Sequence, residues 1–372
     1  MTASMQQTSA LLDRAARIAL RGHGNVEPNP MVGCVITDRS GRVIAEGHHR
    51  TCGGPHAEAI ALEKAGAAAA GGHLYVTLEP CNHTGRTAPC SEAIIKAGIT
   101  RVIYAHGDPN RIACGGAQRL REAGVGVEYQ STRRTIELNA PHTHRCRTGR
   151  PWVIAKWAQT LDGRIATAEG DSKWISSERS RRLVHRERGR VDAILTGIGT
   201  VIADDPQLTA RTVRRPRRVP ERVIIDDQLE IPMETRLVRT AGEFKTIVCC
   251  DAHRLSSEKA DALRKAGVEL ITLGAHGAIA PALASGFQTR DWSNILVEAG
   301  GGVVGRLLNE GLVNEILTMI APTILGDTGA VSSVRGRRTE RITDGLTLEP
   351  VDLRTRGSEF MGWYRLPAAI TE

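Results

Sequence analysis

Segments with a strand pattern alternate with segments that have a helical pattern through most of this sequence, and this alternation limits the fold more than any other feature. Residues 31–37 (MVGCVIT) and 42–47 (RVIAEG) are apolar and rich in β-formers, and the turn DRSG between them predicts a hairpin. Helix and strand patterns then follow in turn up to residue 130: HAEAIALEKAG, HLYVTLE, CSEAIIKAG, TRVIYAHGD, AQRLREAG and VGVEYQ. This succession predicts a mixed sheet covered by helices, an α/β layered domain.

The same alternation resumes beyond Pro151 and predicts a second α/β domain, with strand patterns in DAILTGIGT, RVIIDD, TIVCCD and NILVEAG. A chain of 372 residues is long enough for two domains that each bury a core. The stretch NAPHTHRCRTGRP, which holds His142, His144 and Cys146, is rich in charge and turn formers and predicts a surface linker. We therefore expect domains at residues 1–147 and 148–372.

Composition narrows the class of protein. Hydrophobic residues make up 41% and charged residues 24% of the chain, as in globular proteins. The net charge of +8 suits nucleic acid or a phosphorylated small substrate, but aromatic residues are only 3%, which leaves few for base stacking. No run approaches the roughly 20 apolar residues of a membrane span, and charges interrupt the amphipathic N-terminal helix before it could serve as a signal peptide. Eight cysteines without the dense spacing of a disulfide scaffold indicate a reducing compartment, so we expect a cytoplasmic protein.

Two short motifs in the first half supply the ligands of a metal site. PHAE contributes His56 and Glu58, and EPCNHTGRTAPC contributes Cys81 and Cys90. Catalytic zinc takes three protein ligands and keeps a fourth position for water, which His56, Cys81 and Cys90 satisfy. Glu58, beside the metal at a helix start, is then the acid/base that moves protons between water and a leaving amine. The neighbouring His48, His49 and His83 are interpreted as surface or loop residues.

These motifs resemble those of the zinc nucleoside deaminases, in which His-x-Glu is joined to Pro-Cys-x-x-Cys. The longer loop between Cys81 and Cys90, with EPNPMVG upstream, resembles the deaminase half of the bifunctional riboflavin-biosynthesis deaminase-reductases. The resemblance implies a cytidine-deaminase-like fold and hydrolytic deamination of 2,5-diamino-6-(5-phosphoribosylamino)-4-pyrimidinone, with zinc-activated water attacking the carbon that carries the 2-amino group. It also implies that Asn29 hydrogen-bonds the substrate; the alternative for Asn29 is a turn residue that satisfies its own backbone.

A glycine-rich segment, EAGGGVVGRLL, follows a strand pattern and opens a helix in the second half. Backbone amides at such a helix start can cradle the pyrophosphate of a cofactor. The segment lacks the acidic residue about 20 positions further on that accompanies a Rossmann fingerprint, so it is not interpreted as one.

The second half resembles the reductase partner of the same family, whose fold is like dihydrofolate reductase, through IAKWAQTLDGRIA, GDSKWIS and NILVEAGGGVVGRLLNEGLVNEI. The resemblance implies NADPH-dependent reduction of the ribosyl side chain of 5-amino-6-(5-phosphoribosylamino)uracil, with Lys156 near the reacting sugar carbon. Arg188 and Arg211 carry guanidinium groups suited to the ribose phosphate, or else belong to a solvated basic face. The implied NADPH contacts are Ala158, Trp174, Thr200, Asp204, Gly300, Gly301, Gly302, Val303, Val304, Gly305 and Arg306; the implied substrate contacts are Ser172, Arg188, Leu208, Arg211 and Glu298.

The sequence therefore predicts a two-domain enzyme that uses zinc and NADPH on a small phosphorylated pyrimidine, with no nucleic-acid or membrane partner. It leaves the oligomeric state open, a homo-oligomer included. Two other interpretations remain. One is a nucleic-acid-editing deaminase with a basic appended domain, and the other is a non-enzymatic module in which protein ligands fill all four coordination positions of the zinc. The first requires aromatic stacking and explains none of the second half, and the second leaves Glu58 without a role.

Overall fold

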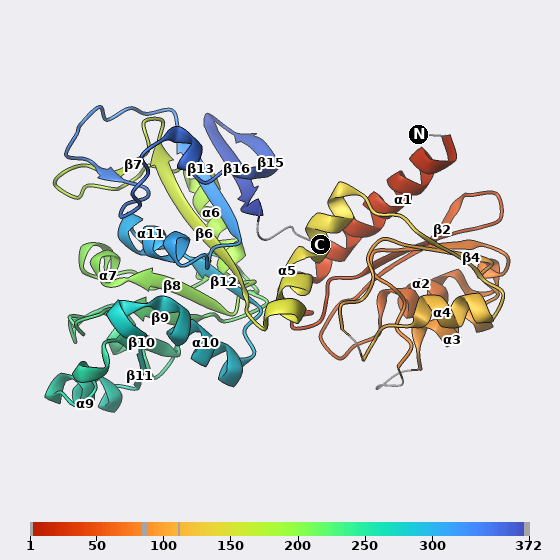
Figure 1. Ribbon diagram of the computed structural model, residues 1–372, viewed down its shortest axis with the longest axis horizontal. Coiled ribbons are helices and arrows are strands. Elements are labelled where there is room, and N and C mark those ends of the chain that lie inside the picture. The colour runs from red at the N-terminus through yellow and green to blue at the C-terminus, as the bar shows by residue number, and fades with distance from the viewer. Residues whose placement is uncertain (1–2, 84–87, 111, 368–372) are drawn as a thin grey trace. The chain divides into compact units, whose positions relative to one another are not determined.

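The computed structural model describes residues 3–83, 88–110 and 112–367. The chain divides into two compact units, Met1–Gly149 and Arg150–Glu372, which are described separately. Each unit combines a central sheet with helices, as labelled in Figure 1, so the predicted α/β class is confirmed. Within these described ranges, no helix is both long enough and apolar enough to cross a lipid bilayer.

The first unit is built on a five-stranded sheet of order β2-β1-β3-β4-β5. Strand β1 is antiparallel to β2 and to β3, whereas β3, β4 and β5 run parallel. The predicted hairpin and the mixed sheet are therefore confirmed. The strands are β1 Gly33–Thr37, β2 Val43–His48, β3 His73–Val76, β4 Arg101–Tyr104 and β5 Gly126–Tyr129.

Helices cover both faces of this sheet, because successive strand residues point to opposite sides and both sides are apolar. Helix α1 buries Leu12 against Val35 and Ile103 on one face. On the other face, α2, α3 and α4 bury side chains such as Ile94 and Leu120. The helices are α1 Ala3–Ala19, α2 Ala57–Ala65, α3 Cys90–Lys96, α4 Gly116–Glu122 and α5 Arg133–Thr148.

The expectation of a surface linker before Pro151 is wrong, because most of this stretch belongs to helix α5. Residues 133–148 are helical, although this stretch is polar and contains a proline. A capping box formed by Thr132 and Thr135 begins the helix, and Gly149, in the left-handed conformation, ends it. Leu138 is buried against α1, and α1 and α5 lie side by side in Figure 1. Tertiary packing and capping thus order a segment whose composition resembles a linker.

The second unit contains a nine-stranded sheet of order β11-β10-β9-β8-β12-β6-β13-β16-β15. The strands from β11 to β13 are parallel, and β16 and β15 add an antiparallel edge. Two short strands, β7 Arg164–Ala166 and β14 Val331–Ser332, pair separately. The sheet strands are β6 Trp152–Thr160, β8 Ala193–Gly197, β9 Glu221–Ile225, β10 Thr246–Cys250, β11 Val268–Thr272, β12 Asn294–Val297, β13 Glu315–Ala321, β15 Glu349–Arg356 and β16 Glu359–Arg365.

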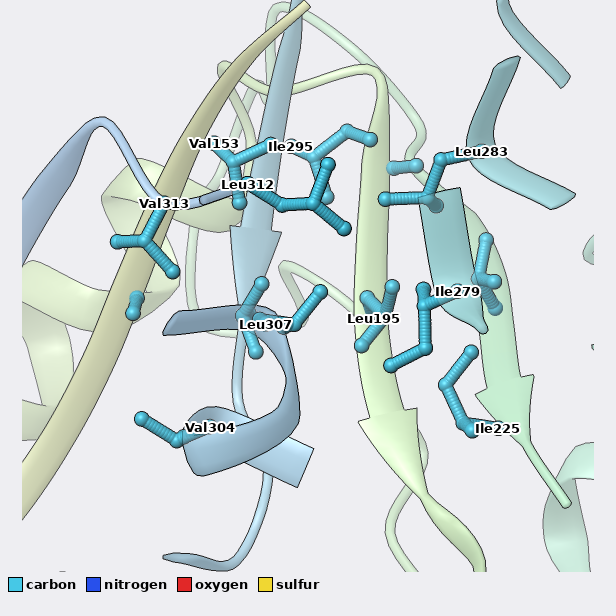
Figure 2. Close-up of a cluster of buried hydrophobic side chains, with 14 of the residues drawn as sticks. Val153, Leu195, Ile225, Ile279, Leu283, Ile295, Val304, Leu307, Leu312 and Val313 are labelled. Carbon is cyan, nitrogen blue, oxygen red and sulfur yellow. The ribbon is translucent and has the colours of Figure 1, made fainter. Parts of the chain in front are cut away.

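Apolar cores lie on both faces of this sheet as well. On one face, side chains of α10 and α11 such as Leu283, Val304 and Leu307 meet Leu195 and Ile295 of the strands (Figure 2). The opposite face packs against α7, α8 and α9. The helices are α6 Glu178–Arg188, α7 Ile198–Asp204, α8 Arg236–Arg239, α9 Glu258–Lys265, α10 Ile279–Arg290 and α11 Gly301–Asn309.

The parallel strands of the second unit end at one common edge of the sheet. Gly197 ends β8, Ile225 ends β9 and Val297 ends β12, and each is followed directly by a loop or a helix start. In open α/β sheets, ligands bind outside the carboxyl ends of the strands. This edge therefore brings together the segments that hold most of the expected cofactor and substrate residues.

Candidate active sites

Three predicted metal ligands meet in the first unit. His56 is the N-cap residue directly before α2, Cys90 is the first residue of α3, and Cys81 lies in the loop that follows β3. The Nδ1 atom of His56 lies 3.5 Å from Sγ of Cys81 and 3.3 Å from Sγ of Cys90. The three ligand atoms all lie within 4.8 Å of one another. A tetrahedral zinc with ordinary bond lengths separates its nitrogen and sulfur ligands by about 3.5–3.8 Å, so the residues fit this ion.

The two thiols also shift each other's pKa values in opposite directions. The hydrogen bond from Cys90 lowers the pKa of Cys81 to about 4, and the same hydrogen bond raises the pKa of Cys90. The pair therefore shares one proton. A bound dication deprotonates the thiols that coordinate it. Zinc would therefore displace this proton and balance the negative charge of the two thiolates.

Glu58 lies beside the ligands, buried within the first turn of α2. Its side chain is 3% exposed, and burial raises the pKa of this carboxyl. The charge of His56 and the thiol of Cys90 both influence this carboxyl, so it is close to the expected metal ligands. A carboxyl with a raised pKa at this place suits proton transfer near neutral pH. The structure thus brings Glu58 together with His56, Cys81 and Cys90.

The loop that carries Cys81 is fixed by contacts that the sequence did not reveal. The Glu79 carboxylate accepts hydrogen bonds from the backbone N–H groups of Gly115 (3.1 Å) and Ala117 (3.0 Å) at the start of α4. A Cβ atom at Gly116 would lie 1.7 Å from the Pro80 carbonyl oxygen, so only glycine allows α4 to approach this closely. Glu79 and Gly116 therefore hold the Cys81 loop in place.

His49 lies in a loop directly after β2, as expected, but it is buried and not a surface residue. Only 3% of it is exposed, and its ring meets the His56 ring edge-on with centroids 5.6 Å apart. The Nδ1 atom of His49 lies 3.0 Å from the Pro55 carbonyl oxygen, and Nε2 lies 3.4 Å from Nδ2 of Asn29. Asn29 is thus part of the same cluster, connected to the zinc ligand through His49.

A second pair near this site joins α5 to the loop after β4. Nε2 of His142 lies 3.8 Å from Oδ1 of Asp108, and both side chains are largely buried. Burial by itself lowers the pKa of His142, but the nearby Asp108 carboxylate and the Cys146 thiol raise it to about 9. Asp108 also raises the pKa of His56 through its charge. Sequence reasoning missed this pair because His142 was assigned to a linker.

In the second unit, Lys156, Glu298 and Arg188 form a buried charged cluster. The Glu298 carboxylate accepts hydrogen bonds from Nε (2.5 Å) and Nη2 (2.9 Å) of Arg188, and lies 3.7 Å from Nζ of Lys156. Burial alone would raise the pKa of Glu298, but Arg188 and Lys156 lower it to about 2. Burial lowers the pKa of Lys156. The alternative that places Arg188 on a solvated basic face is wrong, because its side chain is only 13% exposed.

Arg211 differs from Arg188 because it is exposed. Partial burial of its guanidinium group and the nearby charge of Arg188 lower the pKa of Arg211. Burial, together with Arg188 and Arg211, also lowers the pKa of His185 to about 4, so this imidazole is neutral at pH 7. The two arginines therefore create the positive field of this region, and Arg211 is the one open to an incoming anion.

The glycine-rich segment begins α11 as predicted. The N–H group of Gly300 donates a hydrogen bond to Oγ1 of Thr200 (3.2 Å), a residue of α7. A Cβ atom at Gly301 would lie 2.5 Å from the Ser332 carbonyl oxygen, whereas Gly302 faces open space. An open helix start of this kind fits a pyrophosphate. Val304, in contrast, is fully buried in the core shown in Figure 2, so only its backbone can reach a cofactor.

The remaining expected residues are spread around this sheet edge. Ala158 lies on β6, and Asp204 ends α7 and pairs with Lys173 at 3.3 Å. Trp174 is 70% exposed, with the Arg181 guanidinium 4.2 Å from its ring centroid. Ser172 is half-buried, and Leu208 is buried with φ 50°. A buried Leu208 side chain leaves only its backbone for a ligand.

Arg306, also on α11, lines a cavity of about 610 Å³. Its guanidinium donates two hydrogen bonds to the Asp227 carboxylate, at 2.8 Å and 2.9 Å, and a third to the Gly277 carbonyl oxygen. Asp227 follows β9 and had not been singled out in the sequence. No periodicity or short motif in the sequence indicates that Arg306 pairs with a residue 79 positions away.

Comparison with known proteins assigns each unit to a domain family. The cytidine and deoxycytidylate deaminase zinc-binding region matches residues 5–106, and the RibD C-terminal domain matches residues 151–361. The riboflavin biosynthesis protein RibD of Escherichia coli (strain K12) is 37% identical over 374 residues, which cover 95% of this chain and 98% of that protein. That of Actinobacillus pleuropneumoniae is 36% identical over 353 residues, covering 94% and 91%.

Solved structures are similar over nearly the whole chain. A Thermotoga maritima protein described as a diaminohydroxyphosphoribosylaminopyrimidine deaminase/5-amino-6-(5-phosphoribosylamino)uracil reductase has a TM-score of 0.82 at 31% identity, covering 98% of this chain and 99% of that one. Acinetobacter baumannii RibD has a TM-score of 0.80 at 33% identity, covering 97% and 99%. The predicted order of folds, cytidine-deaminase-like and then dihydrofolate-reductase-like, is confirmed. A zinc-ligand cluster in the first unit and a reductase domain in the second, in the order shared by these relatives, place the chain in the RibD family of bifunctional riboflavin-biosynthesis deaminase-reductases.

Proposed function

We propose that this chain catalyses two consecutive steps on one phosphorylated pyrimidine. The first unit deaminates 2,5-diamino-6-(5-phosphoribosylamino)-4-pyrimidinone, and the second reduces 5-amino-6-(5-phosphoribosylamino)uracil to the ribityl compound. The observation that carries the proposal is the His56, Cys81 and Cys90 cluster with Glu58 buried beside it, on the same chain as a reductase domain. The reactions are those in the description of the similar Thermotoga maritima protein.

In the deamination, His56, Cys81 and Cys90 would hold zinc, which supplies a Lewis acid that activates water. Glu58 takes a proton from the attacking water and returns it to the amino group as ammonia leaves. Water adds to the ring carbon that carries the 2-amino group, and the bond from that carbon to nitrogen breaks, which gives the uracil. The burial that raises the pKa of Glu58 makes both proton transfers feasible for one group near pH 7.

Asn29 is proposed to position the pyrimidine in this site. Its amide lies against His49, whose ring in turn meets His56, so the amide has a defined place relative to the metal ligands. The Asp108 carboxylate, which lies 3.8 Å from His142 and raises the pKa of His56 through its charge, is proposed to act on the same site. Both groups act by orientation, which lowers the entropic part of the barrier.

In the reduction, NADPH supplies the hydride that reaches the first carbon of the opened ribose. Lys156 is proposed to lie at that carbon, with Glu298 keeping its ammonium group in place and Arg188 fixing Glu298. Arg211 is proposed to bind the ribose phosphate, because it is exposed next to the buried Arg188. Ser172 and the Leu208 backbone complete the proposed substrate contacts.

The cofactor is proposed to lie along the carboxyl edge of the second sheet. Its pyrophosphate would meet the open start of α11, where Gly302 leaves room and Thr200 orients the Gly300 amide. The proposed contacts are Ala158, Trp174, Thr200, Asp204, Gly300, Gly301, Gly302, Val303, Val304, Gly305 and Arg306, with Val304 contributing only its backbone.

Turnover by the purified full chain tests this proposal. With the diaminopyrimidine phosphate and NADPH present, we expect one ammonia released and one NADPH oxidised per substrate. With NADPH omitted, ammonia release should continue and the deaminated intermediate should accumulate. Failure to release ammonia from zinc-loaded protein would contradict the deaminase assignment, and ammonia release without NADPH oxidation would contradict the reductase assignment. Size-exclusion chromatography with light scattering would decide the oligomeric state.

A further inference from the structure

The cavity lined by Arg306 adjoins the proposed cofactor path. It lies where β9, β10 and β11 end, and its walls include Asp227, Asp251 and Leu273 from the segments that follow these strands. The remaining wall is Arg306 of α11, five residues beyond Gly301, which corresponds to about 7.5 Å along the helix. Its volume, about 610 Å³, lies within the range of ligand sites. A dinucleotide with its pyrophosphate at the start of α11 can therefore place its adenosine here.

The charges around this cavity are unusual for a site that receives an additional phosphate. Among the described residues that line it, Arg306 is the one arginine or lysine, whereas Asp227 and Asp251 both bring carboxylates. The two residues are neighbours in space, because the N–H group of Asp251 donates to the Asp227 carbonyl oxygen at 3.0 Å. A phosphate group carries between one and two negative charges at pH 7, so it would be repelled by this pair.

Asp227 also occupies the hydrogen-bonding face of Arg306. Its carboxylate accepts two parallel bonds from the guanidinium, at 2.8 Å and 2.9 Å, in the geometry that arginine otherwise uses for a phosphate. The Gly277 carbonyl oxygen takes a further Nη2 hydrogen bond. A carboxylate has about four lone-pair sites, so Asp227 retains acceptors for the hydroxyl groups of a ribose.

We propose that Asp227 determines how this chain discriminates between NADPH and NADH, by competing with the 2′-phosphate for Arg306 and by accepting a hydrogen bond from a free 2′-hydroxyl. The preference for NADPH is then small, less than about tenfold in affinity. This inference rests on the proposed binding of the cofactor at α11 and adds a specificity-determining residue to it. It makes NADH a usable hydride donor for this chain.

Direct binding to the full chain tests the proposal without reference to turnover. Isothermal titration calorimetry would use four probes: NADPH, NADH, adenosine 2′,5′-bisphosphate and AMP. For the unaltered chain, we expect each phosphorylated probe to bind within about tenfold of its unphosphorylated counterpart. Asp227→Asn and Asp227→Ser should tighten NADPH and the bisphosphate by about tenfold, the value of one charge-assisted hydrogen bond, and weaken NADH and AMP severalfold.

Asp251→Asn is the matched control, because it removes a carboxylate from the same cavity without freeing Arg306. Its effect on the NADPH to NADH affinity ratio should be several times smaller than that of Asp227→Asn. A preference of the unaltered chain for NADPH above 100-fold would overturn the proposal, as would an unchanged ratio in both Asp227 variants with unaltered melting temperatures. If none of the four probes binds, the cofactor assignment to α11 fails, and this proposal fails with it.

Discussion

Arg188 holds Glu298 through two hydrogen bonds, of 2.5 Å and 2.9 Å, although 110 residues separate them in the sequence. Because this guanidinium is already paired and largely buried, its role differs from that of a free phosphate receptor. It fixes the carboxylate that in turn faces Lys156. The two arginines predicted to bind phosphate are therefore expected to behave differently when they are replaced.

Arg188→Ala should lower both stability and reduction. It leaves Glu298 in a buried place with Lys156 as its remaining charged partner, and breaking such a pair costs roughly 3 kcal/mol. Denaturant unfolding should show this loss, and kcat of the reductase should fall. Arg211→Ala should instead leave stability nearly unchanged and raise KM for the phosphorylated substrate by about 10- to 100-fold, as expected for a lost charge-assisted hydrogen bond. Equal effects of the two changes on KM would contradict this distinction.

Glu298→Gln should move the pH dependence of reduction. Burial lowers the pKa of Lys156, and the charge of Glu298 counteracts this effect. Without that charge the pKa of Lys156 falls further, so the ammonium form is lost at a lower pH. If reduction requires the ammonium, the falling limb of kcat against pH moves to lower pH. The Glu58→Gln chain is the control, because its change lies in the other unit and should leave this profile in place.

Glu58→Gln should abolish deamination without releasing zinc. Glutamine keeps the size of the side chain but cannot take a proton, and general acid–base catalysis contributes about 10²–10⁴-fold. We expect ammonia release to fall by at least that factor, while metal analysis still finds one zinc per chain. NADPH oxidation on supplied deaminated substrate should continue. Near-normal ammonia release would show that Glu58 is not the proton carrier.

Cys90→Ser should remove zinc and deamination together. Cys90 begins α3 and supplies one of the three clustered ligand atoms, so its loss leaves only two. Atomic absorption should find less than one zinc per ten chains after dialysis against a chelator. Cys52→Ser is the matched control, because Cys52 is an exposed thiol outside the cluster, and that variant should keep its full zinc content. Full zinc in the Cys90 variant would mean that another ligand replaces it.

His142 should make the stability of the first unit depend on pH. Burial lowers its pKa, but Asp108 and Cys146 raise it to about 9, above the ordinary value of 6.5. A group with a raised folded pKa stabilises fully below its unfolded pKa and loses this contribution as pH rises through the folded value. The contribution of up to about 3 kcal/mol should therefore be present at pH 6 and lost by about pH 9.5. Urea unfolding of His142→Gln should lack this change, whereas the exposed His253→Gln should retain it.

The sequence by itself determined the α/β class of both units, the three residues that cluster as candidate zinc ligands and the glycine-rich start of α11. These features depend on local patterns. Segments with strand periodicity alternate with segments with helical periodicity, two short motifs contain His56, Cys81 and Cys90, and glycines lie between a strand and a helix. Tertiary structure alone decided that α5 is a helix, because capping at Thr132 and burial of Leu138 outweigh a polar composition. It also decided the pairs Asp108 with His142, Glu298 with Arg188 and Asp227 with Arg306. Their members come from separate strand ends and helices, and only the packing of the sheet and its helices sets which charges meet.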